Sequence, residues 1–211
     1  MMLIKWLNFR RKSVTQSKFL KMRTEEINIY QFSELSEKVQ QKVLEKRRYW
    51  NVSEDWWQYV YDEFTEDHPQ YEDCEISHRG FSSQGDGASF TFRLDSAYFE
   101  KWVEALEIPG WKKAILVHYT PHFYGKRNTS HYSHKYTVTI GRETYLHHRQ
   151  LIDEFKEEVY EEFERHLTSE FYSHCDELYR TLENKYDYLT SDECIIEGME
   201  DCEFYENGET Y

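Results

Sequence analysis

The residues with the clearest capacity for chemistry form a short glycine-rich stretch in the first half of the chain. This stretch and the hydroxyl groups beside it comprise Ser82, Ser83, Gln84, Gly85, Asp86, Gly87 and Ser89. Glycines on both sides of Asp86 permit positive φ angles, which turn several backbone N–H groups into one concavity. We expect this turn to hold a phosphate, or Asp86 to bind a ribose hydroxyl. The alternative is a hairpin turn without a ligand, and no Gly-Lys-Ser/Thr sequence follows that would indicate a P-loop.

Basic, histidine and tyrosine side chains gather in a second stretch that contains Tyr124, Lys126, Arg127, His131, Tyr132 and His134. On a predicted strand His118 and His122 point to one face and extend this group into a histidine-rich corner, which could hold a metal or an acid–base pair. However, the chain has no HExxH or paired Cys/His spacing and no nucleophile elbow. We therefore expect the corner and Arg79 to contact an anionic ligand, with no metal and no cofactor.

Adjacent tryptophans supply a candidate for base stacking. Trp56 and Trp57 lie in a predicted helix and cannot both face the same side of it. One is expected in the core, and Trp56 is the candidate to stack on a base or to line a subunit contact.

Composition excludes several classes of protein. The 211 residues carry a net charge of −14, and the 18 Tyr, 13 Phe and 6 Trp are too many aromatic residues for a disordered chain. No apolar run approaches the ~18 residues of a membrane span. The four cysteines form no CxxC pair, which suits a reducing cytoplasm. Residues 143–211 hold 21 of the 40 acidic residues, so this region would repel nucleic acid.

Hydrophobic periodicity predicts an α+β fold in which helices pack on an antiparallel sheet of about four to five strands. The expected strands are 27–32, 74–81, 88–94, 112–122 and 132–140, with a terminal hairpin at Asn207-Gly208. The expected helices begin at Ser33 or Ser36, at Ser53, at Ser96, at Leu146 as one long acidic C-terminal helix, and at a Thr190/Glu193 capping box. Residues 1–23 read as a basic, peripheral extension of a single domain, 24–211.

Three blocks resemble a family of small, uncharacterised proteins encoded by phages and prophages. They are 29–44 with Asp55-Trp56-Trp57, then 80–90 (GFSSQGDGASF), and 131–134 with 186–193 (YDYLTSDE) and 203–208. The resemblance spans about residues 24–211. It implies a phage accessory protein that acts in the bacterial host cytoplasm, where counter-defence is a common task.

The motifs and the resemblance lead to one hypothesis and two alternatives. We expect a homo-oligomeric binding protein, rather than an enzyme, that sequesters a small anionic, nucleotide-derived immune signal of the host. The first alternative is an acidic DNA mimic that binds a host defence or nucleic-acid-binding protein directly. The second is a nucleotide-cleaving enzyme that uses the corner of His118, His122, His131 and His134. Membrane binding is not expected. Nucleic-acid binding is not expected either, because the negative net charge of the chain would repel phosphates.

Overall fold

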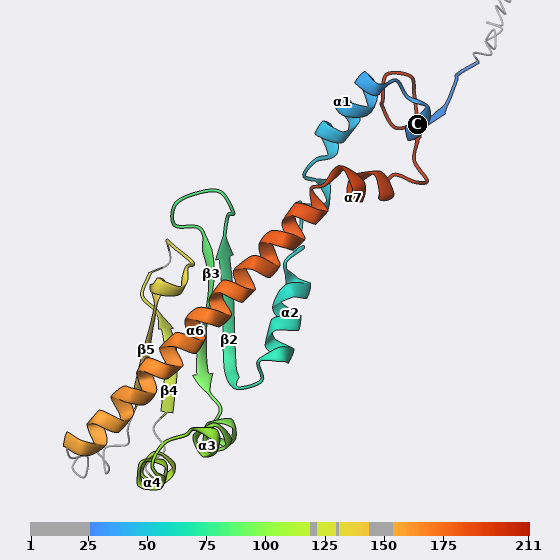
Figure 1. Cartoon of the computed structure of the whole chain (residues 1–211). Helices are drawn as coiled ribbons and strands as arrows, with labels where there is room; N and C mark the ends of the chain where they lie inside the picture. The colour runs from blue at the N-terminus through green and yellow to red at the C-terminus, as the bar shows by residue number, and fades with distance from the viewer. Residues whose placement is uncertain (1–25, 119–121, 130, 144–153) are drawn as a thin grey trace, which may run out of the picture.

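The computed structural model describes residues 26–118, 122–129, 131–143 and 154–211 (Figure 1). Its centre is an antiparallel four-stranded sheet in the order β2 (Tyr71–Arg79), β3 (Gly87–Leu94), β4 (His122–Arg127) and β5 (Val138–Glu143). Helix α6 (Glu154–Leu189) crosses one face of this sheet and continues beyond it (Figure 1). The predicted α+β class is confirmed, including the antiparallel sheet and the long C-terminal helix.

The main core lies between α6 and the central strand β3. Phe90 and Phe92 are two residues apart, so they point to the same face of β3, and both are buried. Their ring centroids lie 4.8 and 5.8 Å from that of Phe171 on α6. Helices α2 (Gln58–Asp67) and α3 (Ser96–Ala105) contribute buried residues to this core, and α4 (Gly110–His118) lies against α3 and α6.

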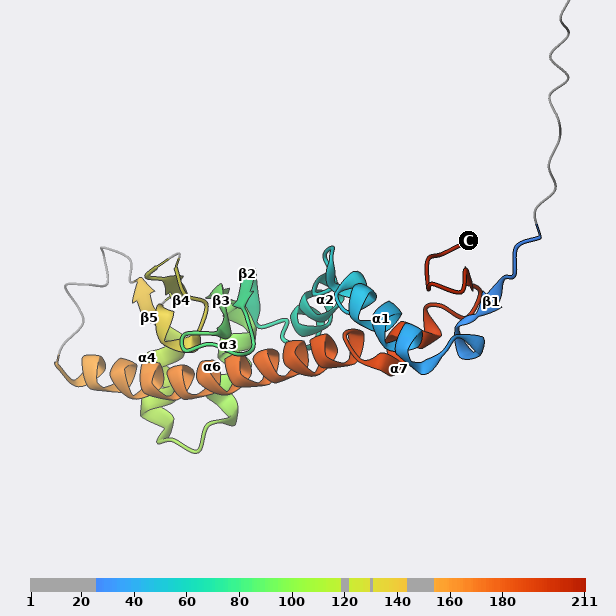
Figure 2. The same ribbon diagram turned by 90° about the horizontal axis from the view of Figure 1, so that it is seen from above.

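A second, smaller hydrophobic cluster lies at the far end of α6. Figure 2 shows that α6 runs along the molecule, with the four-stranded sheet over one part and α1 and α7 at its C-terminal end. The elements here are β1 (Tyr30–Gln31), α1 (Glu37–Arg47), α7 (Asp192–Glu197) and β6 (Glu203–Phe204), with 3₁₀ turns at Phe32–Glu34 and Trp50–Val52. The buried members are Leu35, Val43, Leu44, Ile195, Met199 and Phe204.

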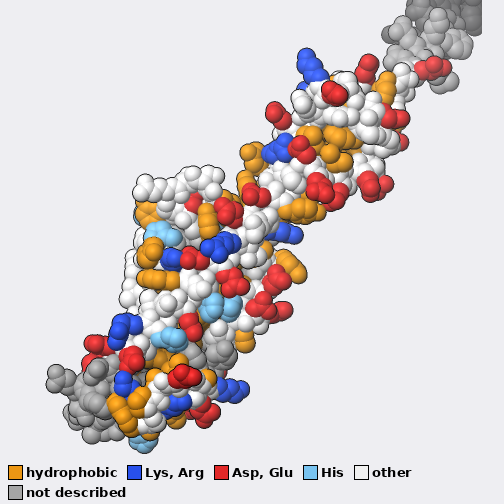
Figure 3. Space-filling view, viewed as in Figure 1, with side chains coloured by type: hydrophobic (Ala, Val, Ile, Leu, Met, Phe, Trp, Pro, Cys, Tyr) orange, Lys and Arg blue, Asp and Glu red, His pale blue; other side chains and the backbone are white. Residues whose placement is uncertain are grey.

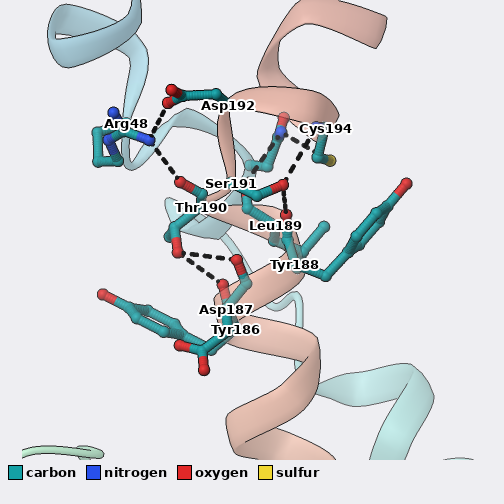
Figure 4. Close-up of polar contacts among 10 residues, drawn as sticks. Arg48, Tyr186, Asp187, Tyr188, Leu189, Thr190, Ser191, Asp192 and Cys194 are labelled. Atoms are coloured by element: carbon teal, nitrogen blue, oxygen red, sulfur yellow. Dashed lines mark hydrogen bonds and ion pairs between the residues drawn. The ribbon is translucent and has the colours of Figure 1, made fainter.

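Polar contacts fix the junction between α6 and α7 (Figure 4). The Arg48 guanidinium donates to the Thr190 carbonyl at 2.9 Å and to the Asp192 carboxylate. The Ser191 hydroxyl accepts the Cys194 N–H at 3.2 Å and so caps α7. The short helix predicted here is confirmed, but its cap is Ser191 and not Thr190, whose hydroxyl donates back to the Tyr186 carbonyl. The YDYLTSDE block is therefore the end of α6 and its capped junction.

Several predicted elements are confirmed. The predicted strands 74–81 and 88–94 correspond to β2 and β3, and the helix predicted from Ser96 is α3. The terminal hairpin forms, because Phe204 pairs with Thr210 across a turn in which the Gly208 N–H donates to the Tyr205 carbonyl. The basic extension and the predicted start of the long helix, 146–153, lie outside the described residues.

The prediction was wrong between residues 110 and 137. The expected strand 112–122 is largely helix α4, because a short apolar run such as Ala-Ile-Leu-Val suits either structure. Residues 124–127, which lie between the two expected strands, belong to strand β4, and the expected strand 132–140 begins only at Val138, after a 3₁₀ turn at Lys135–Thr137. The β4–β5 loop consequently lies later in the sequence than predicted, and it carries His131 to Tyr136.

No helix within the described residues is both long enough and apolar enough to cross a membrane.

Candidate functional site

The glycine-rich turn between β2 and β3 is closed by its own aspartate. The Asp86 carboxylate accepts the N–H groups of Ser82 and Ser83 at 2.9 and 2.6 Å. The backbone N–H groups of the turn were expected to hold a phosphate, and these two of them are already satisfied. Ser82 and Ser83 therefore shape the turn, and a ligand would meet the following residues, from Gln84 onward.

The two glycines of the turn permit close contact with the β4–β5 loop. Gly85 has a φ of +95°, and a Cβ there would lie 2.9 Å from the Tyr132 ring. A Cβ on Gly87 would lie 2.7 Å from Cβ of His134 and 2.9 Å from its Cα. The Arg79 guanidinium also donates to the His131 carbonyl, which ties the loop to β2. The loop is thus packed directly on the turn.

The turn, the β4–β5 loop and α6 line an open cavity of about 750 Å³, which we call the turn–helix cavity. Six lining residues had been predicted as ligand contacts: Gln84, Gly85, Asp86, Gly87, Tyr132 and His134. Six had been missed: Ala88, Lys135, Tyr136, Cys175, Asp176 and Tyr179. Lys135 and Tyr136 directly follow the predicted loop. The sequence points only weakly to the three α6 residues, because their one distinguishing feature is a position beside the buried residues Phe171 and Leu178 of the helix.

One ion pair dominates the electrostatics of the turn–helix cavity. The Lys135 Nζ donates to the Asp176 carboxylate at 2.6 Å, and this hydrogen bond raises the pKa of Lys135. The same ammonium group lies 5.5 and 5.6 Å from the ring centroids of Tyr136 and Tyr172. Lys135 is the one lysine or arginine among the described lining residues, and Asp86 adds a second negative charge to that of Asp176.

Tyrosines and a thiol complete the lining. Burial raises the pKa of Tyr179, with smaller contributions from Glu183 and Asp86, so the phenol stays protonated. Burial also raises the pKa of the Cys175 thiol, which is therefore no nucleophile at neutral pH. Nδ1 of His134 is buried and has no hydrogen-bond partner among the described residues. A buried polar atom of this kind is costly unless something satisfies it.

Other predicted contacts lie outside this cavity. Ser89 is fully buried, so its predicted ligand contact is wrong. Lys126 is exposed on the sheet face opposite α6, because it alternates with Gly125, the partner of the core residue Phe92. Arg127 Nη2 lies 3.5 Å from the carbonyls of Glu75 and Ser89. Arg79 holds the loop through its hydrogen bond to the His131 carbonyl, and the His131 side chain is exposed.

The predicted histidine corner does not form. His118 ends α4 and His122 begins β4, so they do not share a strand face. His122 pairs with Glu143, whereas the loop of His131 and His134 leaves from the opposite end of β4. Among the described residues, only His134 of this group lines the turn–helix cavity.

Trp56 belongs to an aromatic cluster around His78, outside the cavity lining. Its ring centroid lies 5.7 Å from those of His78 and Tyr186 and 6.1 Å from that of Phe81. The Tyr61 hydroxyl lies 2.6 Å from His78 Nδ1, and burial raises the pKa of Tyr61 to about 12. Trp56 therefore contacts Phe81, which precedes the turn, and it does not line the turn–helix cavity, where a ligand was expected.

Three half-buried histidines should make the fold sensitive to mild acid. Burial lowers the pKa of His68, His78 and His174 below the ordinary value of 6.5. The unfolded chain then binds more protons just below pH 6.5, so the free energy of unfolding falls as the pH drops through this range. Thermal unfolding between about pH 7 and pH 6 should show a falling Tm. His78→Gln should weaken that dependence, and the exposed His131→Gln should not; equal slopes in all three proteins would contradict the assignment.

Comparison with known proteins gives a single finding. Residues 56–192, about two thirds of the chain, match a protein family described as a domain of unknown function (DUF8835). This range contains the sheet, α2 and α6, and it ends at the capped α6–α7 junction. No curated protein and no solved structure matches this sequence.

Proposed function

We propose that this chain, which belongs to the family of the domain of unknown function DUF8835, is a binding protein that sequesters a small nucleotide-derived ligand in the turn–helix cavity. One observation carries the proposal. Three segments far apart in sequence meet around a cavity of about 750 Å³, and they include the glycine-rich turn and the Tyr132–His134 loop. That volume falls within the ~300–1,000 Å³ typical of small-molecule sites.

Aromatic surfaces in the cavity suit a nucleobase. Tyr132 and Tyr136 are at least half exposed, at 50% and 67%, so their rings can be covered by a ligand. Tyr179 presents a third ring from α6. Stacking of a base on an aromatic side chain contributes about 1–3 kcal/mol and does not depend on which base is present.

The Lys135–Asp176 pair suits a phosphate that arrives from solvent. Its side chains are 22% and 49% exposed, so a ligand oxyanion can reach the ammonium group. An arriving phosphate would replace the Asp176 carboxylate as the partner of Lys135 and offer three acceptor oxygens. An imidazole N–H of His134 or the Tyr179 hydroxyl could then donate a further hydrogen bond.

Binding fits the site better than cleavage does. The Cys175 thiol in the lining is held protonated by burial, and the histidine corner expected for catalysis does not form. With the resemblance to phage proteins, the proposal is that the protein withholds a host immune signal in the bacterial cytoplasm. A homo-oligomer belongs to the same proposal, because sequestering sites often lie near a subunit contact.

The roles of Lys135 and Asp176 can be tested by calorimetry. The ligands are a panel of mononucleotides, cyclic nucleotides and cyclic dinucleotides with the matching nucleosides. Lys135→Gln should weaken nucleotide binding about 10–100-fold, as expected for a lost bond to a charged group. Asp176→Asn should strengthen it several-fold, because the ammonium group loses its competitor. Neither change should alter nucleoside binding.

The matched control is Lys126→Gln, on the opposite sheet face, which should bind like the wild type. Native mass spectra of the same mixtures report intact ligand or cleaved product. If no member of the panel binds, or if Lys126→Gln weakens binding as much as Lys135→Gln does, the proposal fails. Product masses would favour the nucleotide-cleaving alternative.

The structure provides less support for the acidic inhibitor. Figure 3 shows basic side chains interspersed with acidic ones on the face that α6 occupies. Glu157 and Glu164 pair with Arg142, and Glu162 pairs with Lys112 at 2.6 Å, so these carboxylates attach α6 to its neighbours. Glu161 is exposed, and Glu161→Lys leaves those pairs in place. If that variant lost function while the Lys135 variants kept it, the acidic inhibitor would be favoured.

A further inference from the structure

The geometry points to a divalent transition-metal site, with Zn²⁺ as the expected ion, formed by His68, His174 and Glu177. We call these residues the His–Glu cluster. One potential ligand atom from each residue lies within 4.8 Å of the other two. The cluster goes beyond the proposed function, since none of its residues lines the turn–helix cavity. It lies within the residues that match the family.

Local structure delivers these three side chains to one place. His68 ends α2, where its N–H donates to the Phe64 carbonyl and Pro69 prevents further helix. His174 and Glu177 are three residues apart on α6, so they lie on the same helix face. The cluster therefore joins the end of α2 to the middle of α6.

The surroundings of His174 suit ligation through Nε2. The Tyr71 hydroxyl oxygen lies 2.9 Å from His174 Nδ1 and can accept a hydrogen bond from its N–H, which leaves the electron pair on Nε2 free. Metal-binding histidines almost always use their second ring nitrogen in such a hydrogen bond, which fixes the ring and the tautomer. The two rings face each other with centroids 4.2 Å apart and an interplanar angle of 43°.

The charge state of the cluster also suits a metal ligand. Burial lowers the pKa of both histidines, and His68 lowers that of His174 further. A lowered pKa favours the neutral imidazole, which is the form that binds a metal. Glu177 and Asp67 supply negative charge close to the rings. A bound dication would neutralise that negative charge. Protonation of the imidazoles would do so less readily, because burial disfavours their charged form.

Space for a further ligand remains beside the cluster. A cavity of about 480 Å³ is lined by both histidines and by Gln70, Tyr71, Glu170 and Ser173, among others. Three protein ligands with a fourth position open to water or substrate is the arrangement of catalytic zinc sites. Two imidazoles favour Zn²⁺ and its neighbours over Mg²⁺ or Ca²⁺, which prefer oxygen ligands.

The test is a metal titration of the full chain after treatment with a chelator. Isothermal titration with Zn²⁺ should give one tight site per chain, unaffected by excess Mg²⁺. His68→Ala and His174→Ala should each weaken this site at least 100-fold, and Tyr71→Phe about 10–100-fold through loss of its hydrogen bond. Co²⁺ bound at the same site should show the intense visible absorption of four-coordinate cobalt.

Controls are needed because the chain contains 10 histidines. The exposed His122→Ala should bind Zn²⁺ like the wild type. Glu177 is exposed, so Glu177→Gln keeps the fold and should still weaken binding about tenfold or more. If the folded Glu177→Gln variant and the His68→Ala/His174→Ala double variant bind Zn²⁺ as the wild type does, the cluster is a packing contact and the inference is wrong. Absence of any tight site in the wild type would also overturn it.

Discussion

Gly87→Ala is expected to abolish ligand retention in the turn–helix cavity while the sheet and α6 remain folded. The added Cβ would lie 2.9 Å from Cα of His134, a backbone atom that cannot move without the β4–β5 loop. The loop carries Tyr132, His134, Lys135 and Tyr136, so its displacement moves a third of the residues that line the cavity away from α6. We expect nucleotide affinity to fall at least 100-fold. The overpacking should destabilise the fold by about 1–3 kcal/mol.

The matched control is Gly110→Ala at the start of α4. A Cβ at Gly110 meets no atom within 4 Å, and alanine there restricts the unfolded chain, so stability should stay equal or rise by up to ~1 kcal/mol. Calorimetric binding and urea unfolding measure both effects. Gly87→Ala with wild-type affinity would show that the contact between turn and loop does not form the binding site.

Phe171→Ala should be among the most destabilising single substitutions in the chain. Phe171 is fully buried on α6, and its ring contacts Phe90 and Phe92 of the central strand at 4.8 and 5.8 Å between centroids. Truncation removes that contact and leaves a cavity between helix and sheet, at a cost of about 3–5 kcal/mol. A domain is typically stable by only ~5–15 kcal/mol, so a large part of the unfolding free energy disappears.

Urea unfolding followed by circular dichroism gives this loss directly. Tyr59 is a large aromatic residue that is 67% exposed on α2, and Tyr59→Ala should change stability by less than ~0.5 kcal/mol. If the two substitutions had similar effects, α6 would not be packed on β3 as described. Because α6 also carries Asp176 and His174, a loosened Phe171→Ala variant should lose nucleotide and Zn²⁺ binding together.

Helix α6 links the two candidate sites of this protein. Cys175, Asp176 and Tyr179 line the turn–helix cavity, whereas His174 and Glu177 belong to the His–Glu cluster. Consecutive helical residues are rotated by about 100°, so His174 and Cys175 reach different sides of α6. The two sites can therefore be tested independently by substitutions that are one or two residues apart.

The sequence by itself determined features that depend on neighbouring residues. The stripe Phe163, Leu167, Phe171, Leu178 and Leu182 predicts the buried face of α6, and all five are buried. Alternation along 88–94 predicts β3, and Asp86 between two glycines predicts the turn. Each pattern follows from a backbone period or a local cap, which a few adjacent residues decide.

Tertiary structure decided the rest. The run 112–122 suits helix or strand, and only packing selected α4. The Asp86 carboxylate took the Ser82 and Ser83 N–H groups. Lys135 met Asp176 across the cavity, and His68 met His174, over separations of 41 and 106 residues that no local pattern reports. Such contacts form because packing of the core places α6 against the sheet. Local sequence therefore determines most of the helices and strands, and their packing determines which residues meet in the sites.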